Sequence, residues 1–583
     1  MFENKSLLDN LWKLENFDER EILNLSQKNN LSPLLSKLLY IRNIDSNNID
    51  EFLDPDLINN IPDPFTLIDM DKAITRVIHG ISKNEIFGIV ADYDVDGSTS
   101  ASILYKFLSI FSNKIILKIP NRLSEGYGPN MRIMDEMMQC KASIVFTLDC
   151  GTTSNHIIDN EKFKNIDVIV IDHHLSDTSM PKVHSIINPN RIDESKNFFS
   201  SLAAVGVTFL FLMGLRKKLR ENNFFQEKIK EPNLLSFLDL VSLGTVCDVV
   251  SLKKYNRMFV KIGLELIKQR KNKGISKIID NSNLKSTPSS SDLGFVIGPQ
   301  LNAASRIDDS TLPSKILTSN NIVEIESISR KLILLNEKRK LIESSIFEEA
   351  LIQAELQKHK KYILVYGHEW HNGVLGIIAS RLIEKFYKPS IVISFTNSIG
   401  IGSARSIKNI DLGNIIIAAK NQNLLLGGGG HKMAAGLQIH YKLIEKFDIF
   451  ISQHLSSIPY NIFQRIENFD TIISVNEINN NLLEIIDKLE PFGMDNPEPK
   501  FLINDIQFNQ IKILKDKHLL FFFQNDFSQK LKAICFNCIG TKLGDYLLNH
   551  KNHKLSIGCT IKKDNFNQNV APQIVIKDAM LIN

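Results

Sequence analysis

Between residues 80 and 250, short apolar runs alternate with helical stretches, and this pattern constrains the fold more than any other feature of the sequence. The runs extend from Ile86 to Ala91, Lys114 to Ile119, Ala142 to Leu148 and Ile166 to Ile171. Continuous apolar strands separated by helices indicate a parallel β-sheet that is covered on both faces. We therefore expect a multidomain α/β protein with a parallel-sheet domain in this region.

Three of these four runs end directly in acidic or histidine residues. In open α/β sheets, ligands bind beyond the carboxyl ends of the strands. We therefore expect these side chains to meet at one edge of the sheet, although they are far apart in the sequence. They are Asp92, Asp94, Asp96, Asp149, Asp172, His173 and His174.

The first of these clusters, in the sequence DYDVDGSTS, predicts a site for divalent cations. Its three carboxylates repel one another unless cations neutralise them, and oxygen ligands suit Mg²⁺ or Mn²⁺. A calcium loop of the EF-hand type requires Glu at its twelfth position, where Ile103 stands. Asp248, after a leucine-rich helix, is a further acidic candidate. Two cations roughly 3.5–4 Å apart would activate a water nucleophile for phosphoryl transfer. Each cluster taken alone also fits a helix cap or a solvated turn.

The motifs DYDVDGSTS, TLDCG, IDHH and LGTVCDVV resemble, in order and spacing, those of the DHH phosphoesterase superfamily. Further along, GGGGHKMAAG resembles the signature of the DHHA1 domain that follows the DHH domain in that superfamily, and the run LNAASR has Ser305 where the family has Gly. The resemblance implies two Mn²⁺ or Mg²⁺ ions, contact of His174 with the scissile phosphate, and Asp92 and Asp172 as ligands or as groups that orient ligands. The implied metal ligands are Asp94, Asp96, Asp149, His173 and Asp248.

A second set of residues is expected to bind the nucleic-acid backbone or its terminal phosphate. The four glycines before His431 would let backbone amides approach an anion at the start of a helix that we expect from residue 432. Arg405, beside Ser403 in an expected turn, could bind a phosphate with two hydrogen bonds. A tight turn without a ligand is the alternative. The full predicted set is Arg306, Ser403, Arg405, Gly429, Gly430 and His431.

Over its whole length, the sequence predicts five structural parts. They are an N-terminal helical appendage (1–79), the DHH domain (80–320), a long connecting helix (321–360), a smaller α/β DHHA1 domain (361–460) and an OB-like nucleic-acid-binding β-barrel (461–583). Phe521, Phe522 and Phe523 are candidate stacking residues, but at least one of three consecutive strand residues must point inward. Cys535 and Cys538 have no second ligand pair nearby and are expected to be structural.

The resemblance implies a metal-dependent hydrolase that degrades single-stranded DNA from 5′ to 3′ into 5′-mononucleotides during DNA repair and recombination. A helicase and a single-strand-binding protein are the implied protein partners. One alternative is a phosphodiesterase acting on short oligonucleotides or small phosphodiesters, although the N-terminal extension and the barrel favour a polymeric substrate. The other is a catalytically silent scaffold, which the complete set of carboxylates argues against.

Composition adds little to this interpretation. The net charge of +4 permits a polyanionic partner without requiring one. The start of the chain lacks a basic segment followed by an apolar one, and the most apolar stretch, 201–215, is shorter than the ~20 residues of a membrane span. We therefore expect a buried helix at 201–215, no membrane association and a cytoplasmic protein with reduced cysteines.

Overall fold

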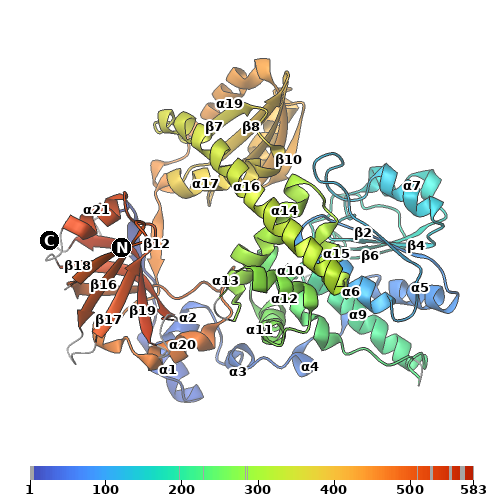
Figure 1. The fold of residues 1–583 in the computed structure, drawn as a ribbon, viewed down its shortest axis with the longest axis horizontal. Helices are drawn as coiled ribbons and strands as arrows, with labels where there is room; N and C mark the ends of the chain where they lie inside the picture. Colours follow the sequence, from blue (N-terminus) through green and yellow to red (C-terminus); the bar gives the residue numbers. More distant parts are fainter. Residues whose placement is uncertain are drawn as a thin grey trace.

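The computed structural model describes residues 5–195, 197–226, 229–282, 284, 287–508, 510–524, 530–549, 554–564 and 571–581. Figure 1 shows three bodies, each built around its own sheet. No helix in the described part of the chain is long and apolar enough to cross a membrane. The apolar stretch 201–215 lies almost entirely in the buried helix α9, Ala204–Glu221, as expected.

The first body contains a five-stranded parallel sheet in the order β3-β2-β4-β5-β6, which confirms the predicted parallel-sheet domain. The central strands β2, β4 and β5 are buried almost throughout because helices cover both faces. The strands are β2 Phe87–Ala91, β3 Ile115–Lys118, β4 Ile144–Leu148, β5 Asp167–Ile171 and β6 Ser185–Ile187; the principal helices are α5 Met70–Ser82, α6 Val95–Leu108, α7 Met131–Gln139, α9 and α10 Leu238–Cys247.

A helical extension follows α10 and leads into the predicted connecting helix. That helix is present as α16, Ile322–Leu356, 35 residues long, and it joins the first body to the second (Figure 1). Asn321 caps its first turn by accepting hydrogen bonds from Val323 N and Glu324 N. The other elements of the extension are α11 Lys254–Lys268, α12 Lys273–Asn281, α13 Ser290–Asp292, the π-helix η4 Leu293–Ile297, α14 Gly298–Ile307 and α15 Leu312–Thr318.

The second body is a smaller α/β unit with a mixed sheet in the order β10-β11-β9-β8-β7. The prediction of a helix that begins at residue 432 is wrong. Residues 434–440 form strand β11, which pairs antiparallel with the glycine strand β10, because successive side chains alternate between buried and exposed as in a half-buried strand. The elements are β7 Ile363–His368, α17 Leu375–Phe386, β8 Ser390–Thr396, β9 Ile399–Arg405, α18 Leu412–Asn421, β10 Gly427–His431, β11 Ala434–His440 and α19 Ile444–Ser456.

The third body has seven paired strands in the order β13-β14-β18-β19-β17-β16-β15. Phe521 and Phe523 are buried in its core while Phe522 is only partly covered, so two of the three consecutive phenylalanines point inward. Cys535 and Cys538 are also buried there, and Cys538 Sγ donates to Cys535 O. The elements are β13 Thr471–Ile472, α20 Asn480–Leu489, β14 Phe501–Ile506, β15 Gln510–Leu514, β16 His518–Gln524, β17 Lys530–Cys535, α21 Lys542–Asn549, β18 Leu555–Lys563 and β19 Pro572–Leu581.

The N-terminal segment, predicted as a helical appendage, packs against this third body. Its strand β1, Leu11–Leu14, pairs in parallel with β12, Ile466–Phe469, and Trp12 Nε1 donates to Asp578 Oδ2 over 3.1 Å. Its helices α1, Glu19–Asn29, α2, Pro33–Ile41, and α3, Ile49–Leu53, contribute apolar side chains to the core of the C-terminal sheet. The two ends of the chain therefore form one structural unit.

Arg257 joins this unit to the first body. It extends from α11 and is almost completely buried. Its guanidinium donates to the carbonyl oxygens of Phe52 and Leu489 at 3.2 and 3.0 Å, and it stacks 3.7 Å above the ring of Phe52. One cation therefore satisfies backbone acceptors from two chain segments that are distant in sequence.

Candidate active site

The strand register explains why the acidic residues meet. Ala91 of β2 lies opposite Leu148 of β4, and Leu148 lies opposite Ile171 of β5. The next residue on each strand, Asp92, Asp149 and Asp172, therefore emerges at the same edge of the sheet. This confirms the convergence that the sequence predicts.

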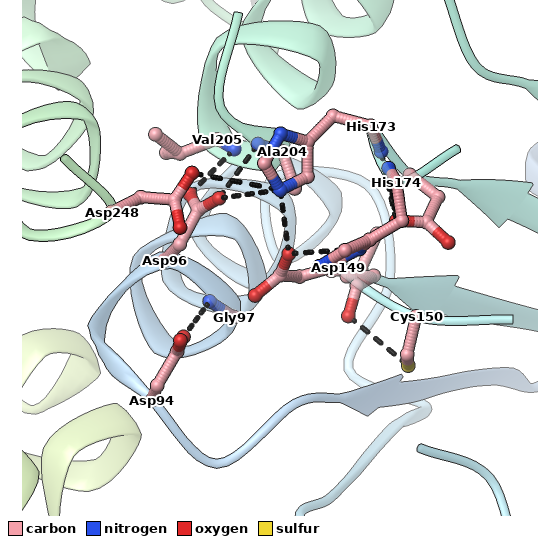
Figure 2. A network of polar contacts seen from close by, with 12 residues as sticks. Asp94, Asp96, Gly97, Asp149, Cys150, His173, His174, Ala204, Val205 and Asp248 are labelled. Atoms are coloured by element: carbon pink, nitrogen blue, oxygen red, sulfur yellow. Dashed lines mark hydrogen bonds and ion pairs between the residues drawn. The ribbon is translucent and has the colours of Figure 1, made fainter. Parts of the chain in front are cut away.

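The structure brings seven of the eight predicted metal-binding and catalytic residues into three overlapping groups. In each group, ligand atoms from three residues lie within 4.8 Å of one another. Figure 2 shows the carboxylates of Asp96, Asp149 and Asp248 around the ring of His173. Asp172 belongs to none of these groups. The groups are Asp92, Asp94 and Asp149; Asp149, His173 and His174; and Asp96, His173 and Asp248.

Asp96 is held in place by the start of α9. Its two carboxylate oxygens accept hydrogen bonds from the backbone N–H groups of Ala204 at 2.7 Å and Val205 at 2.8 Å. Burial, together with the charge of Asp94, raises the pKa of Asp96 to about 7. Asp94 caps α6 by accepting from Gly97 N at 3.0 Å.

The other carboxylates of the cluster lack partners that would offset their burial. Asp92 Oδ1, Asp149 Oδ1 and Asp248 Oδ2 are buried and have no hydrogen-bond partner among the described residues. Burial, followed by repulsion from neighbouring carboxylates, raises the pKa of Asp248 to about 9 and that of Asp149 well above its ordinary value. Such a set of orphaned oxygens is costly for the fold unless cations bind them.

His173 presents a free nitrogen to these carboxylates. Its Nδ1 lies 3.0 Å from the carbonyl oxygen of Leu202, to which it donates, so Nε2 carries the lone pair. Nε2 lies 3.4 Å from Asp149 Oδ1 and 3.5 Å from Asp248 Oδ2. Burial and the neighbouring His174 lower the pKa of His173 to about 4. A neutral imidazole fixed in this tautomer is a suitable metal ligand.

His174 is charged and oriented by Asp172. Burial works against its charge, but the hydrogen bond from its Nδ1 to Asp172 Oδ1, 2.8 Å long, raises the pKa of His174 to about 9. Asp172 also accepts from Thr152 N, His173 N and His174 N. Burial alone would raise the pKa of Asp172, but the hydrogen bond and charge of His174 lower it. These contacts hold the ring of His174 in place, and Tyr127 Oη, 3.2 Å from His174 Nδ1, is a neighbour that the sequence did not reveal.

A cluster of arginines lies at the junction of the first two bodies. Burial, followed by the charges of Arg122, Arg339 and Arg405, lowers the pKa of Arg306 to about 9. Burial and Arg122 also lower the pKa of Arg405. Among the described residues, Arg122, Arg306 and Arg405 form no ion pair with a carboxylate, so their charges are available to an anion.

Within this cluster the outcome of the sequence predictions differs from residue to residue. Arg306 Nη1 donates to Gly373 O at 3.0 Å, and Arg405 Nη1 lies 3.3 Å from Ser403 Oγ. Arg405 is the last residue of strand β9, so the prediction that it lies in a turn is wrong. Gly429, Gly430 and His431 lie in β10, which β11 separates from β9. The expected anion site at a helix N-terminus is therefore absent from this described segment.

Arg122 was missed by the sequence argument. It follows β3, an edge strand of the parallel sheet, and its guanidinium lies 4.7 Å above the ring of Tyr93. The same rule that located the acidic clusters, namely that ligands bind beyond the carboxyl ends of strands, would have found it.

Three segments of the chain match described protein families. Residues 86–245 match the DHH family, N-terminal domain, residues 359–457 match the DHHA1 domain, and residues 469–578 match the RecJ OB domain. The DHH match contains every clustered residue except Asp248.

The chain is similar to bacterial RecJ proteins over most of its length. The chain is 34% identical to the single-stranded-DNA-specific exonuclease RecJ of Dickeya dadantii over 77% of this chain and 80% of that protein. The chain belongs to the RecJ family. It is also 33% identical to RecJ of Escherichia coli K12 over 77% and 80% of the two chains, and 29% identical to RecJ of Bacillus subtilis over 97% and 70%.

Solved RecJ structures agree with this assignment. The chain superposes on the structure of RecJ from Thermus thermophilus in complex with Mn²⁺ with a TM-score of 0.82 and 23% identity. The match covers 98% of this chain and 80% of the Thermus chain, which establishes the shared fold. A structure of exonuclease RecJ bound to manganese covers 68% of this chain and 96% of that chain with a TM-score of 0.58, at 27% identity.

The residues of this chain fit Mn²⁺ or Mg²⁺. Within the three groups, one buried carboxylate oxygen each of Asp92, Asp149 and Asp248, together with His173 Nε2, has no hydrogen-bond partner among the described residues. Carboxylates with one imidazole suit these two cations. We therefore assign the RecJ-family metal cofactor to this cluster on its chemistry.

Proposed function

We propose that the chain is a metal-dependent exonuclease that hydrolyses single-stranded DNA. Its RecJ relatives are named single-stranded-DNA-specific exonucleases. The observation that carries the proposal is the buried cluster of unpartnered carboxylates around His173, at the edge of the sheet where ligands of α/β proteins bind. Membership in the RecJ family supplies the substrate class.

Bound divalent cations would supply a water nucleophile active at neutral pH and would offset charge on the phosphate. Within the chain, Asp92, Asp94 and Asp149 would hold one cation, and Asp96, His173 and Asp248 the other, with Asp149 positioned between the groups. The hydrogen bond from His173 to Leu202 O keeps the ligating nitrogen deprotonated.

His174 would contact the scissile phosphate as a cation. Asp172 holds its ring and keeps it protonated, so that His174 Nε2–H can donate to a phosphate oxygen. A charged donor aimed at the position where negative charge develops contributes more in a buried site than in water. The hydroxyl of Tyr127 donates to Asp149 O at 2.7 Å and keeps this side of the site rigid.

Arg122, Arg306 and Arg405 would bind the phosphate at the 5′ end of the strand. Burial and the charges of Arg122 and Arg405 lower the pKa of Arg306, and burial and Arg122 lower that of Arg405, so three guanidinium groups without carboxylate partners lie close together. Such a cluster favours a dianionic terminal phosphate over a monoanionic internal one. Arg122 follows β3 of the sheet that carries most of the proposed metal ligands, and Arg306 and Arg405 belong to α14 and β9. An end bound by these three residues therefore places a neighbouring phosphodiester near the cations. This arrangement supports 5′ to 3′ degradation to 5′-mononucleotides in DNA repair and recombination.

Protein partners follow from the family rather than from a contact in this chain. A helicase that unwinds the duplex and a single-strand-binding protein that covers the product strand would supply the single-stranded substrate. The C-terminal unit, which matches the RecJ OB domain, is the surface that we assign to the extended strand.

The decisive experiment uses single-stranded DNA labelled at either end, with Mn²⁺, Mg²⁺ or EDTA. We expect metal-dependent release of mononucleotides from the 5′ label by the wild type and none by Asp96→Ala. Arg405→Ala should lose the preference for a 5′-phosphate over a 5′-hydroxyl, whereas Arg330→Ala, on the exposed face of α16, should not. Release from the 3′ label, or hydrolysis of dinucleotides alone, would contradict the proposal.

A further inference from the structure

Two irregular backbone segments meet beside Asp248. One is the end of α10, and the other is the π-helix η4, Leu293–Ile297. Cys247 Sγ donates to Leu293 O at 3.5 Å, and a side-chain carbon on Gly294 would lie 3.5 Å from Val246 Cγ1. The π-helix is therefore packed directly against the residues that precede a predicted metal ligand.

Val249 occupies a position that usually belongs to glycine. It follows the cap residue Asp248 and has a φ of 59°, in the left-handed region that is costly for a β-branched residue. Its side chain is 65% exposed, so packing within the described chain offsets little of this cost. A strained residue retained without such an offset points to a functional use of this segment.

Phe295 shows the same combination of unusual backbone and exposed side chain. It lies at the centre of the π-helix and is 82% exposed. π-Helical turns insert one extra residue into a helix and occur frequently at functional sites. Leu293 and Ile297 of the same turn are buried, so Phe295 lies on the opposite, solvent-exposed face of this helix.

A small cavity connects this segment to the arginine cluster. It has a volume of about 140 Å³, and its lining includes Cys247, Gly294, Asn302 and Arg306. Asn302 Oδ1 is buried and has no hydrogen-bond partner among the described residues. The cavity therefore extends from Cys247, the neighbour of Asp248, to the proposed phosphate-binding residue Arg306, and Gly294, the residue before Phe295, forms part of its wall.

We propose that Phe295 is a stacking platform for a nucleobase of the first two nucleotides at the 5′ end of the strand. This proposal rests on the proposed function. Every base has an aromatic face, so stacking on Phe295 would bind the strand without sequence preference. A base stacked on Phe295 has left the stack of a duplex, which adds to the selection of single strands.

The test compares Phe295→Ala, Phe295→Trp and the wild type on single-stranded DNA with one abasic nucleotide at position 1, 2, 3 or 6. On intact DNA we expect KM to rise about 10-fold in Phe295→Ala with kcat nearly unchanged, and Phe295→Trp to restore it. One abasic site at position 1 or 2 should raise the KM of the wild type by the same factor as Phe295→Ala does on intact DNA, so that wild type and Phe295→Ala no longer differ on that substrate. Tyr460→Ala, which removes another exposed aromatic ring, is the matched control.

The outcomes separate the two proposals. A wild type that does not degrade intact single strands refutes the proposed function itself. A wild type that is active but equally sensitive to abasic sites at all four positions overturns the stacking platform, as does a Phe295→Ala variant that responds to each abasic site as the wild type does. If Phe295→Ala does not fold, the position dependence of the wild type and the activity of Phe295→Leu decide the question.

Discussion

Replacing Asp172 by Asn tests how His174 is kept charged. Asp172 accepts the hydrogen bond from His174 Nδ1 at 2.8 Å, and this contact is the principal reason that the pKa of His174 reaches about 9 against an ordinary value of 6.5. At pH 7.5 a group with a pKa of about 9 is roughly 97% protonated, whereas one at 6.5 is roughly 9% protonated. If only the charged form binds the scissile phosphate, kcat/KM at pH 7.5 falls at least about tenfold.

The assay is the pH dependence of kcat/KM on 5′-phosphorylated single-stranded DNA with saturating Mg²⁺. Bound cations lower the pKa of His174 in both proteins, so the quantity to compare is the position of the alkaline limb. We expect that limb to move down by about 2 pH units in Asp172→Asn, with activity partly recovered at pH 6. Asp167→Asn, at the opposite end of β5, is the control because its side chain pairs with Arg76 away from the site.

A uniform decrease in rate, with the two pH profiles parallel, would refute this reasoning. Such a result would mean that Asp172 supports the loop through its bonds to Thr152 N and His173 N without setting the charge of His174. Thermal unfolding of both variants separates loss of fold from loss of charge.

Gly373→Ala should lower kcat/KM about 100-fold with little change in melting temperature, because a side-chain carbon there would overlap Arg306 O between the two bodies, whereas Gly427→Ala meets only ordinary contacts and should stay active. The stabilisation by Mn²⁺ in a thermal-shift assay should grow from pH 5.5 to pH 8. The folded-state pKa values of Asp96 and Asp248 are raised to about 7 and about 9, so the metal-free protein is most stable at low pH and loses stability as the pH rises through these values. A stabilisation by Mn²⁺ that does not change with pH would contradict the assignment of these two residues to the metal site. Arg257→Ala should cost about 2–4 kcal/mol of unfolding free energy and split calorimetric unfolding into two transitions, and a single transition at the wild-type temperature would show that Arg257 does not join the bodies.

The sequence by itself determined the parallel sheet and the convergence of the acidic residues at its edge. Apolar runs report burial on both faces, and the carboxyl ends of parallel strands must lie at one edge, so Asp92, Asp149 and Asp172 were predictable as neighbours. The long helix α16 was also predictable because its charged sequence has helical periodicity and no Gly or Pro.

The local sequence pattern predicted the wrong element where the same residues are compatible with both a helix and a strand. The segment after His431 contains alanines and a methionine that favour a helix, yet it forms β11 because the neighbouring strands β9 and β10 provide hydrogen-bond partners on both sides. With that helix, the expected anion site at its N-terminus is lost as well.

Only the tertiary structure decided what each site residue does. Asp172 and Asp149 both end strands, but the hydrogen bonds of Asp172 to four protein donors leave it to orient His174, while Asp149 Oδ1 has no partner among the described residues and is available to a cation. Likewise Arg122 follows β3 and Arg306 lies in α14, so only the folded chain brings these two charges together. Periodicity encodes which residues are buried, whereas the direction and partners of a buried polar group depend on chain segments that meet only in the folded protein.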